Sequence, residues 1–215
     1  MALSELMTRT DAAVNGPRTL YLYGKGGWYG RVGAPPPAQP GETVAPASVL
    51  AQMEHNDPDK YQRYQYAAAQ VGIDFGALPA KMPACDCSGF VTWALGLPRA
   101  PSPAAAHGWI NTTSIWGEAQ SPGARFEWCT SAQEPRRAVE GALLVYPHVG
   151  NEIGHIGIVT AVDAVGNATE VVHCAPQNYL QPAAPGRRHA ILRTKPGLLL
   201  DHPKAITVWC RDIER

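Results

Sequence analysis

Cys85-Asp86-Cys87-Ser88-Gly89-Phe90-Val91-Thr92-Trp93-Ala94-Leu95 is the most informative stretch of the sequence, because it joins a pair of cysteines to an apolar run. Apolar residues recur at steps of three and four between Phe90 and Leu95, which predicts a short buried helix. Gly96, directly after the run, is a typical helix terminator. The helix is therefore expected to begin at Cys87 and to carry that cysteine at its N-terminus.

A cysteine in this position has two interpretations. The backbone N–H groups at a helix N-terminus and the positive end of the helix dipole favour the thiolate, which is the nucleophilic form. The small residues Ser88 and Gly89 leave room for a substrate carbonyl to approach those N–H groups. A lone cysteine is nevertheless more often a small buried apolar residue. The position of Cys87 alone does not decide between a nucleophile and a core residue.

Runs of strand composition dominate the second half of the chain. They cover residues 141–146, 153–162, 170–174, 190–194 and 205–210. Strands that follow one another through short turns form antiparallel sheets, so we expect an antiparallel sheet here. The expected helices come mainly earlier, over residues 1–16, 57–71 and 87–95. This order predicts the α+β class.

The remaining segments are expected to be loops, apart from a strand over residues 19–23. Residues 33–46 are rich in proline and predict a surface excursion. Residues 97–135 are rich in Pro, Ser and Gly and predict irregular structure, in which Trp109 and Trp116 are anchors rather than exposed residues. The length predicts one domain over residues 1–215, with a Pro/Gly-rich insertion around 28–80.

Composition argues against several classes of protein. Lysine plus arginine number 18, as do aspartate plus glutamate, so the zero net charge gives no indication of nucleic-acid binding. Five cysteines are an odd number, which argues against a disulfide framework. No run approaches the ~18 apolar residues of a membrane span, and residues 1–16 lack a signal-peptide core. We expect a protein that is not membrane-embedded, and that is cytoplasmic or delivered by a phage or a secretion system.

Two histidines in the expected strands offer the base that a cysteine nucleophile needs. His155 lies in Gly154-His155-Ile156-Gly157, where the glycines leave space around the imidazole. His173 lies in the next expected strand and could fix the tautomer of His155 by contacting its far ring nitrogen. The contact requires one strand register, because a slip of one residue puts the rings on opposite faces. Otherwise each histidine is more commonly a hydrogen-bonded residue of the core.

Three motifs resemble those of the NlpC-type cell-wall peptidases, a group of papain-like cysteine peptidases. They are residues 85–91, 154–159 and 171–175, in this order. The resemblance extends over roughly residues 19–175 and implies a papain-like fold in which the nucleophile-bearing helix packs on the antiparallel sheet. It implies that Cys87 is the nucleophile, His155 the general base and His173 the orienting residue.

The resemblance also implies a substrate. Members of the family hydrolyse amide bonds in peptidoglycan stem peptides without a cofactor, so peptidoglycan or its stem peptides are the expected partner. Tyr21 resembles the family's tyrosine near the nucleophile, and Ser88 follows the nucleophile directly. These two residues are candidate substrate contacts. Trp109, in the stretch 109–113, is a third candidate. The oligomeric state and the bond that is cut are not predicted.

Three alternatives stay open at the level of the sequence. Cys85, Cys87, His155, His173 and Cys174 are potential zinc ligands, although their spacing differs from the Cys-x2-Cys pairs of structural zinc sites. The domain could instead recognise wall fragments or a protein partner without catalysis. It could also be a papain-like amidase or acyltransferase for a non-wall substrate, because fold and catalytic residues do not set specificity.

Overall fold

The computed structural model of the protein describes residues 1–26, 36–56, 58–70, 74–99, 110–180 and 190–214. The α-helices are α1 (Leu3–Asn15), α2 (Pro46–Asn56), α3 (Pro58–Gln70), α4 (Cys87–Ala94), α5 (Thr112–Glu118) and α6 (Gly197–Leu200). The 3-10 helices are η1 (Phe75–Ala77) and η2 (Pro176–Leu180). The strands are β1 (Leu20–Tyr21), β2 (Glu42–Val44), β3 (Met82–Cys85), β4 (Phe126–Trp128), β5 (Leu143–Tyr146), β6 (His155–Val162), β7 (Ala168–Cys174), β8 (Ile191–Thr194) and β9 (Ile206–Cys210). Among the described residues, no helix has both the length and the apolar composition of a membrane span.

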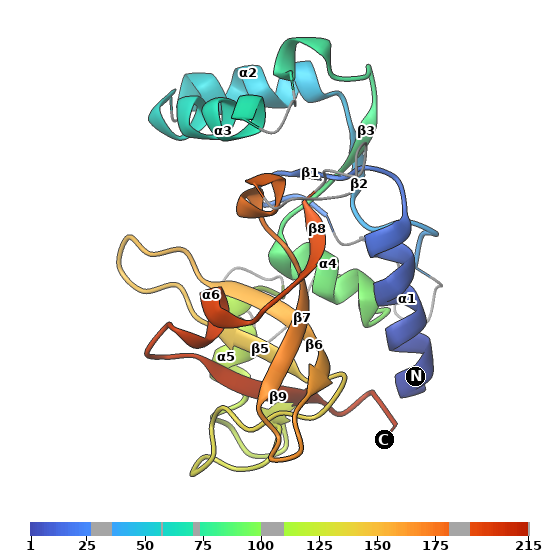
Figure 1. The fold of residues 1–215 in the computed structure, drawn as a ribbon, viewed down its shortest axis with the longest axis vertical. Coiled ribbons are helices and arrows are strands. Elements are labelled where there is room, and N and C mark those ends of the chain that lie inside the picture. The colour runs from blue at the N-terminus through green and yellow to red at the C-terminus, as the bar shows by residue number, and fades with distance from the viewer. Residues whose placement is uncertain (27–35, 57, 71–73, 100–109, 181–189, 215) are drawn as a thin grey trace.

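A six-stranded antiparallel sheet forms the core of the molecule (Figure 1). Its strands lie in the order β4-β9-β5-β6-β7-β8. The last strand of the chain, β9, lies between β4 and β5 and pairs with both. Every side chain of β5 and β9 is buried, so this pair of strands lies at the centre of the hydrophobic core. The antiparallel sheet and the α+β class predicted from the sequence are confirmed.

Helix α4 places Cys87 beside this sheet, because the helix packs against the interior strands β6 and β7 (Figure 1). Its N-cap is Asp86, whose side chain accepts a hydrogen bond of 2.7 Å from the backbone N–H of Gly89. Gly96 ends the helix in the left-handed conformation, with a φ of 67°. All eight residues of α4 are buried. The short buried helix predicted from the sequence is confirmed.

Gly89 allows a loop to cross directly over α4. A Cβ at this position would lie 2.6 Å from the carbonyl oxygen of Lys25 and 2.8 Å from the carbonyl carbon of Gly26. The space that the sequence suggested for an approaching substrate carbonyl is therefore filled on this side by protein backbone. Gly89 serves the contact between α4 and the segment that follows β1.

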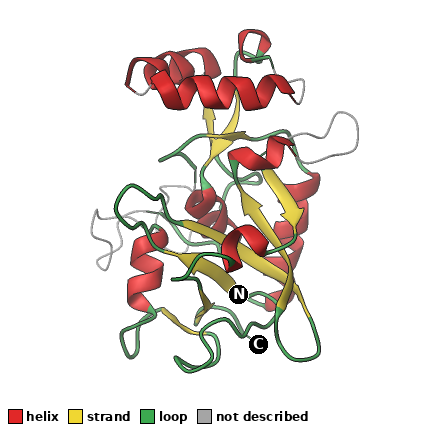
Figure 2. Cartoon of the chain, turned by 60° about the vertical axis from the view of Figure 1, so that its left-hand side comes forward, coloured by secondary structure: helices red, strands yellow, loops and turns green. Residues whose placement is uncertain are grey.

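The first half of the chain also forms a three-stranded sheet and the helices α2 and α3. In this sheet, β3 pairs with β1 in parallel and with β2 in antiparallel orientation. Helices α2 and α3 lie side by side, away from the six-stranded sheet (Figures 1 and 2). The helix predicted over 57–71 corresponds to α3, whereas α2 and β2 were not predicted. Pro46 starts α2 at a position where a helix needs no N–H donor, so the proline that suggested a loop is compatible with a helix start.

The prediction of irregular structure throughout residues 97–135 is wrong, since α5 and β4 lie there. Asn111 caps α5 by accepting a 2.9 Å hydrogen bond from Ser114 N–H, and Ser114 Oγ accepts one of 2.9 Å from Asn111 N–H. Such a capping box starts a helix without apolar periodicity. Trp116 is partly buried and its indole N–H donates to a backbone carbonyl, as an anchor does. Trp109 lies outside the described residues.

All five cysteines are buried, and no disulfide forms among them. The Sγ atoms of Cys85 and Cys174 lie 3.4 Å apart, where β3 meets β7. Burial raises the pKa of the Cys174 thiol well above its usual range. Cys129, Cys174 and Cys210 belong to the hydrophobic core.

Candidate active site

The two histidines predicted as base and orienting residue contact each other. The Nε2 atom of His155 lies 2.7 Å from the Nδ1 atom of His173, and the ring planes meet at 81°. The sheet register pairs His173 with Gly157, so His155 lies two residues further along the same face of β6. The register on which the sequence prediction depended is therefore the one that brings the rings together.

Gly157 and Gly154, on either side of His155 in the sequence, each allow a close approach of a neighbouring segment. A Cβ at Gly157 would lie 3.1 Å from the Cβ of His173, tighter than most real contacts. A Cβ at Gly154 would lie 2.7 Å from the backbone nitrogen of His148 and closer still to Thr112 Oγ1. Gly157 thus lets the strand that carries His173 pack closely on β6, and Gly154 admits the side chain of Thr112 and the backbone of His148.

The thiol of Cys87 lies against the start of β6. Backbone N–H groups of Ser88 and Ile156 act on its sulfur as hydrogen-bond donors and favour the thiolate. Ile156 directly follows His155, so the thiol and the candidate base lie next to each other. The structure thereby brings together Cys87, His155 and His173, the three residues predicted to be catalytic.

Burial favours the uncharged forms of all three groups. Desolvation raises the pKa of Cys87 far above its usual range, and the charge of Asp86 raises it further. Burial, followed by the neighbouring His173, lowers the pKa of His155 to about 3. Burial also lowers the pKa of His173 to about 4. Desolvation therefore opposes the thiolate that the helix N-terminus favours.

A buried ion pair lies directly behind the nucleophile. Asp86 and Arg99, both almost fully buried, are joined through Oδ2 and Nη2 at 2.8 Å. Arg99 Nη1 also donates to the carbonyl oxygens of Lys25 and Gly26, which fixes the loop over α4. Ser88 Oγ accepts from Arg99 Nη2 at 2.8 Å and donates to Asp86 Oδ1 at 3.1 Å. The arginine lowers the pKa of the thiol and so opposes the effect of the carboxylate.

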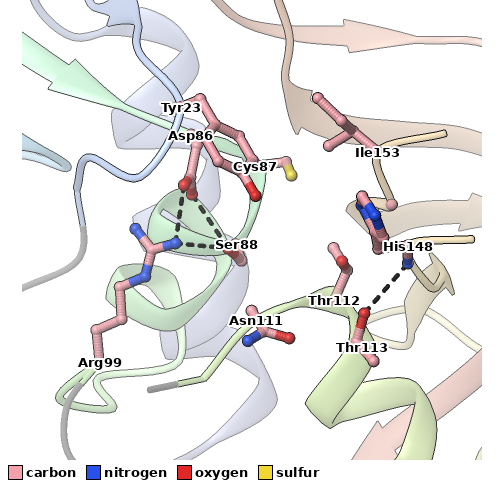
Figure 3. A pocket seen from close by; sticks show the side chains of 11 residues that line it. Tyr23, Asp86, Cys87, Ser88, Arg99, Asn111, Thr112, Thr113, His148 and Ile153 are labelled. Carbon is pink, nitrogen blue, oxygen red and sulfur yellow. Dashed lines mark hydrogen bonds and ion pairs between the residues drawn. The ribbon is translucent and has the colours of Figure 1, made fainter. Parts of the chain in front are cut away.

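The sulfur of Cys87 points into a cavity of about 290 Å³ (Figure 3). The cavity is lined by Tyr23, Asp86, Cys87, Ser88, Arg99, Asn111, Thr112, Thr113, His148, Ile153 and Gly154. Ser88 is thus placed at the cavity, as predicted for a substrate contact. The last three residues of the stretch 109–113 also line it, whereas Trp109 lies outside the described residues. All of these lining residues come from outside the 28–80 insertion.

The structure places Tyr23 rather than Tyr21 at the cavity. Tyr21 pairs with Cys85 in the small sheet and is only 8% exposed, so its side chain belongs to the core. Tyr23 follows the end of β1 and is 54% exposed. Tyr21 does not line this cavity, and its role as a substrate contact stays a prediction. The two tyrosines are two residues apart in the sequence. The structure distinguishes them because β1 ends at Tyr21, before Tyr23.

Other residues near the thiol carried little signal in the sequence. Tyr146 lies opposite His155 across β5 and β6, with ring centroids 6.3 Å apart. Burial raises the pKa of Tyr146 to about 12, and the charges of Glu152 and Cys87 add to this effect. Arg99 follows a predicted helix end in a Pro-rich segment, where no local pattern indicates a buried cation. Asp86 was visible as a residue adjacent to Cys87.

The geometry does not favour the zinc alternative. The described residues contain no group of three or more His, Cys, Asp or Glu side chains placed to hold one ion. The facing nitrogens of His155 and His173 share a hydrogen bond instead of converging on a common point.

Comparison with known proteins gives one match. A family model described as the CHAP domain matches residues 79–178, which include Cys87, His155 and His173. No curated protein and no solved structure matches the chain. The CHAP match confirms the resemblance to NlpC-type enzymes and the papain-like fold, and it indicates, at a coarse level, a peptidoglycan hydrolase of the cysteine or amidase type. Residues 79–178 are therefore similar to CHAP domains, the papain-like group to which the cysteine and histidine motifs of the chain also point.

Proposed function

We propose that this protein is a cysteine peptidase or amidase that hydrolyses amide bonds in peptidoglycan stem peptides. Cys87 is the nucleophile, His155 the general base and His173 the residue that orients the base. The observation that carries the proposal is the 2.7 Å contact between His155 and His173, together with the cavity into which Cys87 opens and which Gly154, the residue before His155, lines. Two buried imidazoles in contact next to a buried thiol cost stability, and a proton-transfer role accounts for that cost.

The first half-reaction forms a thioester. The Nδ1 atom of His155 takes the thiol proton while the sulfur of Cys87 attacks the amide carbonyl carbon. The backbone N–H of Cys87, at the start of α4, donates to the negative oxygen of the tetrahedral intermediate, since the N–H groups of Ser88 and Gly89 already donate to the Cys87 sulfur and to Asp86. His155 then gives its proton to the leaving nitrogen, and the amine departs. Because the resting groups are uncharged, proton transfer accompanies the attack instead of preceding it.

The second half-reaction releases the acid. Water enters after the amine has left, and His155 takes a proton from it as the oxygen attacks the thioester carbonyl. Collapse of the intermediate breaks the carbon–sulfur bond, and the proton on His155 returns to the sulfur. The side chain of His173 keeps the ring of His155 in one orientation through both halves. The enzyme is restored without any cofactor taking part in these steps.

The proposal is tested by incubating the protein with purified peptidoglycan and with soluble stem peptides. New amino groups and fragment masses are measured for wild type, Cys87→Ala and Cys129→Ala. Cys129 is buried away from the cavity, so its variant controls for the loss of a core thiol. We expect cleavage by wild type and by Cys129→Ala and none by Cys87→Ala. The fragment masses then identify the bond that is cut.

Two other outcomes separate the alternatives. If wall substrates are not cleaved but iodoacetamide labels Cys87 selectively, the thiol is activated and the substrate belongs to another class of amide or ester. If Cys87 is inert to iodoacetamide and no substrate is cleaved, the enzymatic proposal fails. A domain that recognises wall fragments without catalysis then becomes the better interpretation, and binding to insoluble peptidoglycan in a pull-down tests it.

A further inference from the structure

We propose that Thr194, a residue of β8 beyond the CHAP match, is a positioning residue that sets the tautomers of both active-site histidines. Its Oγ1 atom lies 3.0 Å from His173 Nε2, the ring nitrogen that does not contact His155. Strand β8 pairs with β7 and holds Thr194 opposite Val171, two residues along from His173. The proposal rests on the catalytic roles given above to Cys87, His155 and His173.

The directions of the hydrogen bonds that link His155, His173 and Thr194 are coupled. One proton lies between His155 Nε2 and His173 Nδ1, because their separation of 2.7 Å is that of a hydrogen bond. A neutral imidazole carries a proton on one nitrogen and a lone pair on the other. His155 can accept the thiol proton at Nδ1 only if its own proton is on Nε2, where it is donated to His173. His173 must then carry its proton on Nε2 and donate it to Thr194.

The opposite direction gives an inactive arrangement. If the Thr194 hydroxyl donates to His173 Nε2, the proton of His173 moves to Nδ1 and is donated to His155 Nε2. His155 then carries its proton on Nδ1, the nitrogen that takes the thiol proton in the proposed mechanism, and that nitrogen can no longer accept it. The active site therefore needs Thr194 to act as an acceptor. A hydroxyl can accept while donating its own proton elsewhere, which a valine methyl cannot do.

A second cavity gives the hydroxyl proton of Thr194 somewhere to go. This cavity, of about 540 Å³, is lined by His173, by residues of η2 and by residues of the segment 193–197, including Thr194. It lies on the Nε2 side of His173, away from the side that contacts His155. Solvent in this cavity can accept the hydroxyl proton, which leaves a lone pair on Oγ1 for His173. The series of hydrogen bonds that orients His155 thus ends at Thr194, whose hydroxyl contacts solvent.

The tautomers can be observed directly by nitrogen NMR of protein labelled with ¹⁵N-histidine. Signals are assigned with His155→Asn and His173→Asn. In wild type we expect both rings to carry their protons on Nε2 and to have unprotonated Nδ1 atoms. A proton on Nδ1 of His173 in wild type would overturn the proposal. This measurement needs no substrate, so it remains decisive even if the proposed peptidoglycan activity fails.

Matched variants test the consequence for the thiol. Thr194→Val removes the acceptor at nearly constant volume, Thr194→Ser retains it, and Thr169→Val removes an exposed threonine from β7. We expect Thr194→Val to slow alkylation of Cys87 by iodoacetamide by about tenfold, since one hydrogen bond is lost. Thr194→Ser and Thr169→Val should stay within about twofold of wild type, which is well inside the range of one hydrogen bond. Where hydrolysis is measurable, kcat should fall in Thr194→Val with KM unchanged.

Two results would contradict the positioning role. Equal alkylation rates in Thr194→Val and wild type would show that the hydroxyl does not act on the thiol–imidazole pair. Equal losses in Thr194→Val and Thr194→Ser would show that shape, and not the acceptor, is what matters. Inert Cys87 in every variant, together with the expected wild-type tautomers, would refute the proposed function while leaving the role of Thr194 in fixing the tautomers intact.

Discussion

Acid should destabilise this protein at a pH where its carboxylates are still charged, because His155 and His173 are buried as neutral rings. Their pKa values in the folded protein are lowered to about 3 and about 4, against an ordinary value of 6.5. The unfolded chain therefore binds more protons than the folded one below pH 6.5, and stability falls as the pH falls. The full contribution is present above pH 6.5. It is lost progressively toward pH 4.

The size of the loss down to pH 5 depends mainly on the unfolded chain. At pH 5 both folded rings are still neutral, whereas each histidine of the unfolded chain is almost fully protonated. Each ring then costs about 2 kcal/mol relative to pH 8, and the pair costs about 4 kcal/mol. Against a typical total of about 5 to 15 kcal/mol, this is a large fraction of the stability.

Urea unfolding at pH 8 and at pH 5, followed by tryptophan fluorescence, measures this loss. With a slope of about 2 kcal/mol per molar urea, a loss of 4 kcal/mol shifts the midpoint by about 2 M. The double variant His155→Asn/His173→Asn provides the control, because it retains every carboxylate of the wild type. We expect its midpoint to change much less between the two pH values. If wild type and double variant lose the same stability, the rings are not held neutral by burial and the reasoning fails.

Three further predictions concern the surroundings of the thiol. Arg99→Met leaves the Asp86 carboxylate buried without its cation, so urea unfolding should show a loss of about 3 to 5 kcal/mol. Gly154→Ala forces a Cβ against Thr112 and should cost about 1 to 3 kcal/mol by urea unfolding and slow Cys87 alkylation, whereas Gly117→Ala, with open space around it, should not. Peptide mapping after iodoacetamide treatment of the folded protein should find Cys87 alkylated and the four other buried cysteines intact, since Cys87 alone among them lines the cavity.

Much of the fold was predictable because local patterns and long-range pairing agree. The apolar spacing of α4 predicts a helix, and its partners β6 and β7 are equally clear strands, so each element supports the other. Helix α5 was missed because it begins with the polar sequence Asn111-Thr112-Thr113-Ser114, whose side chains cap the helix. Strand β4 has only three residues and exists through its pairing with β9, some 80 residues later. Pairing between strands so far apart in the sequence produces no local sequence pattern.

The candidate site, like the fold, was predictable only in part. Cys87, His155 and His173 were predictable because each lies within its own motif, and the register of β6 on β7 confirms that the rings share a face. The charge state of the site was not predictable. The helix N-terminus favours a thiolate, but the degree of burial that outweighs it depends on the tertiary structure. The cation that opposes Asp86 comes from Arg99, for which the sequence gives no local signal.

If the thiol and the imidazoles rest uncharged, the residues around them must fix which nitrogen of His155 carries the proton. An enzyme with a preformed thiolate–imidazolium pair must stabilise two buried charges before substrate arrives, which burial makes costly here. A neutral pair avoids that cost, but it reacts only if the imidazole presents a lone pair to the thiol. The tautomer of His155 then controls reactivity more than its basicity does. The hydrogen-bonded chain runs from His155 through His173 to Thr194, so the proposed catalytic unit extends past residue 178, where the CHAP match ends.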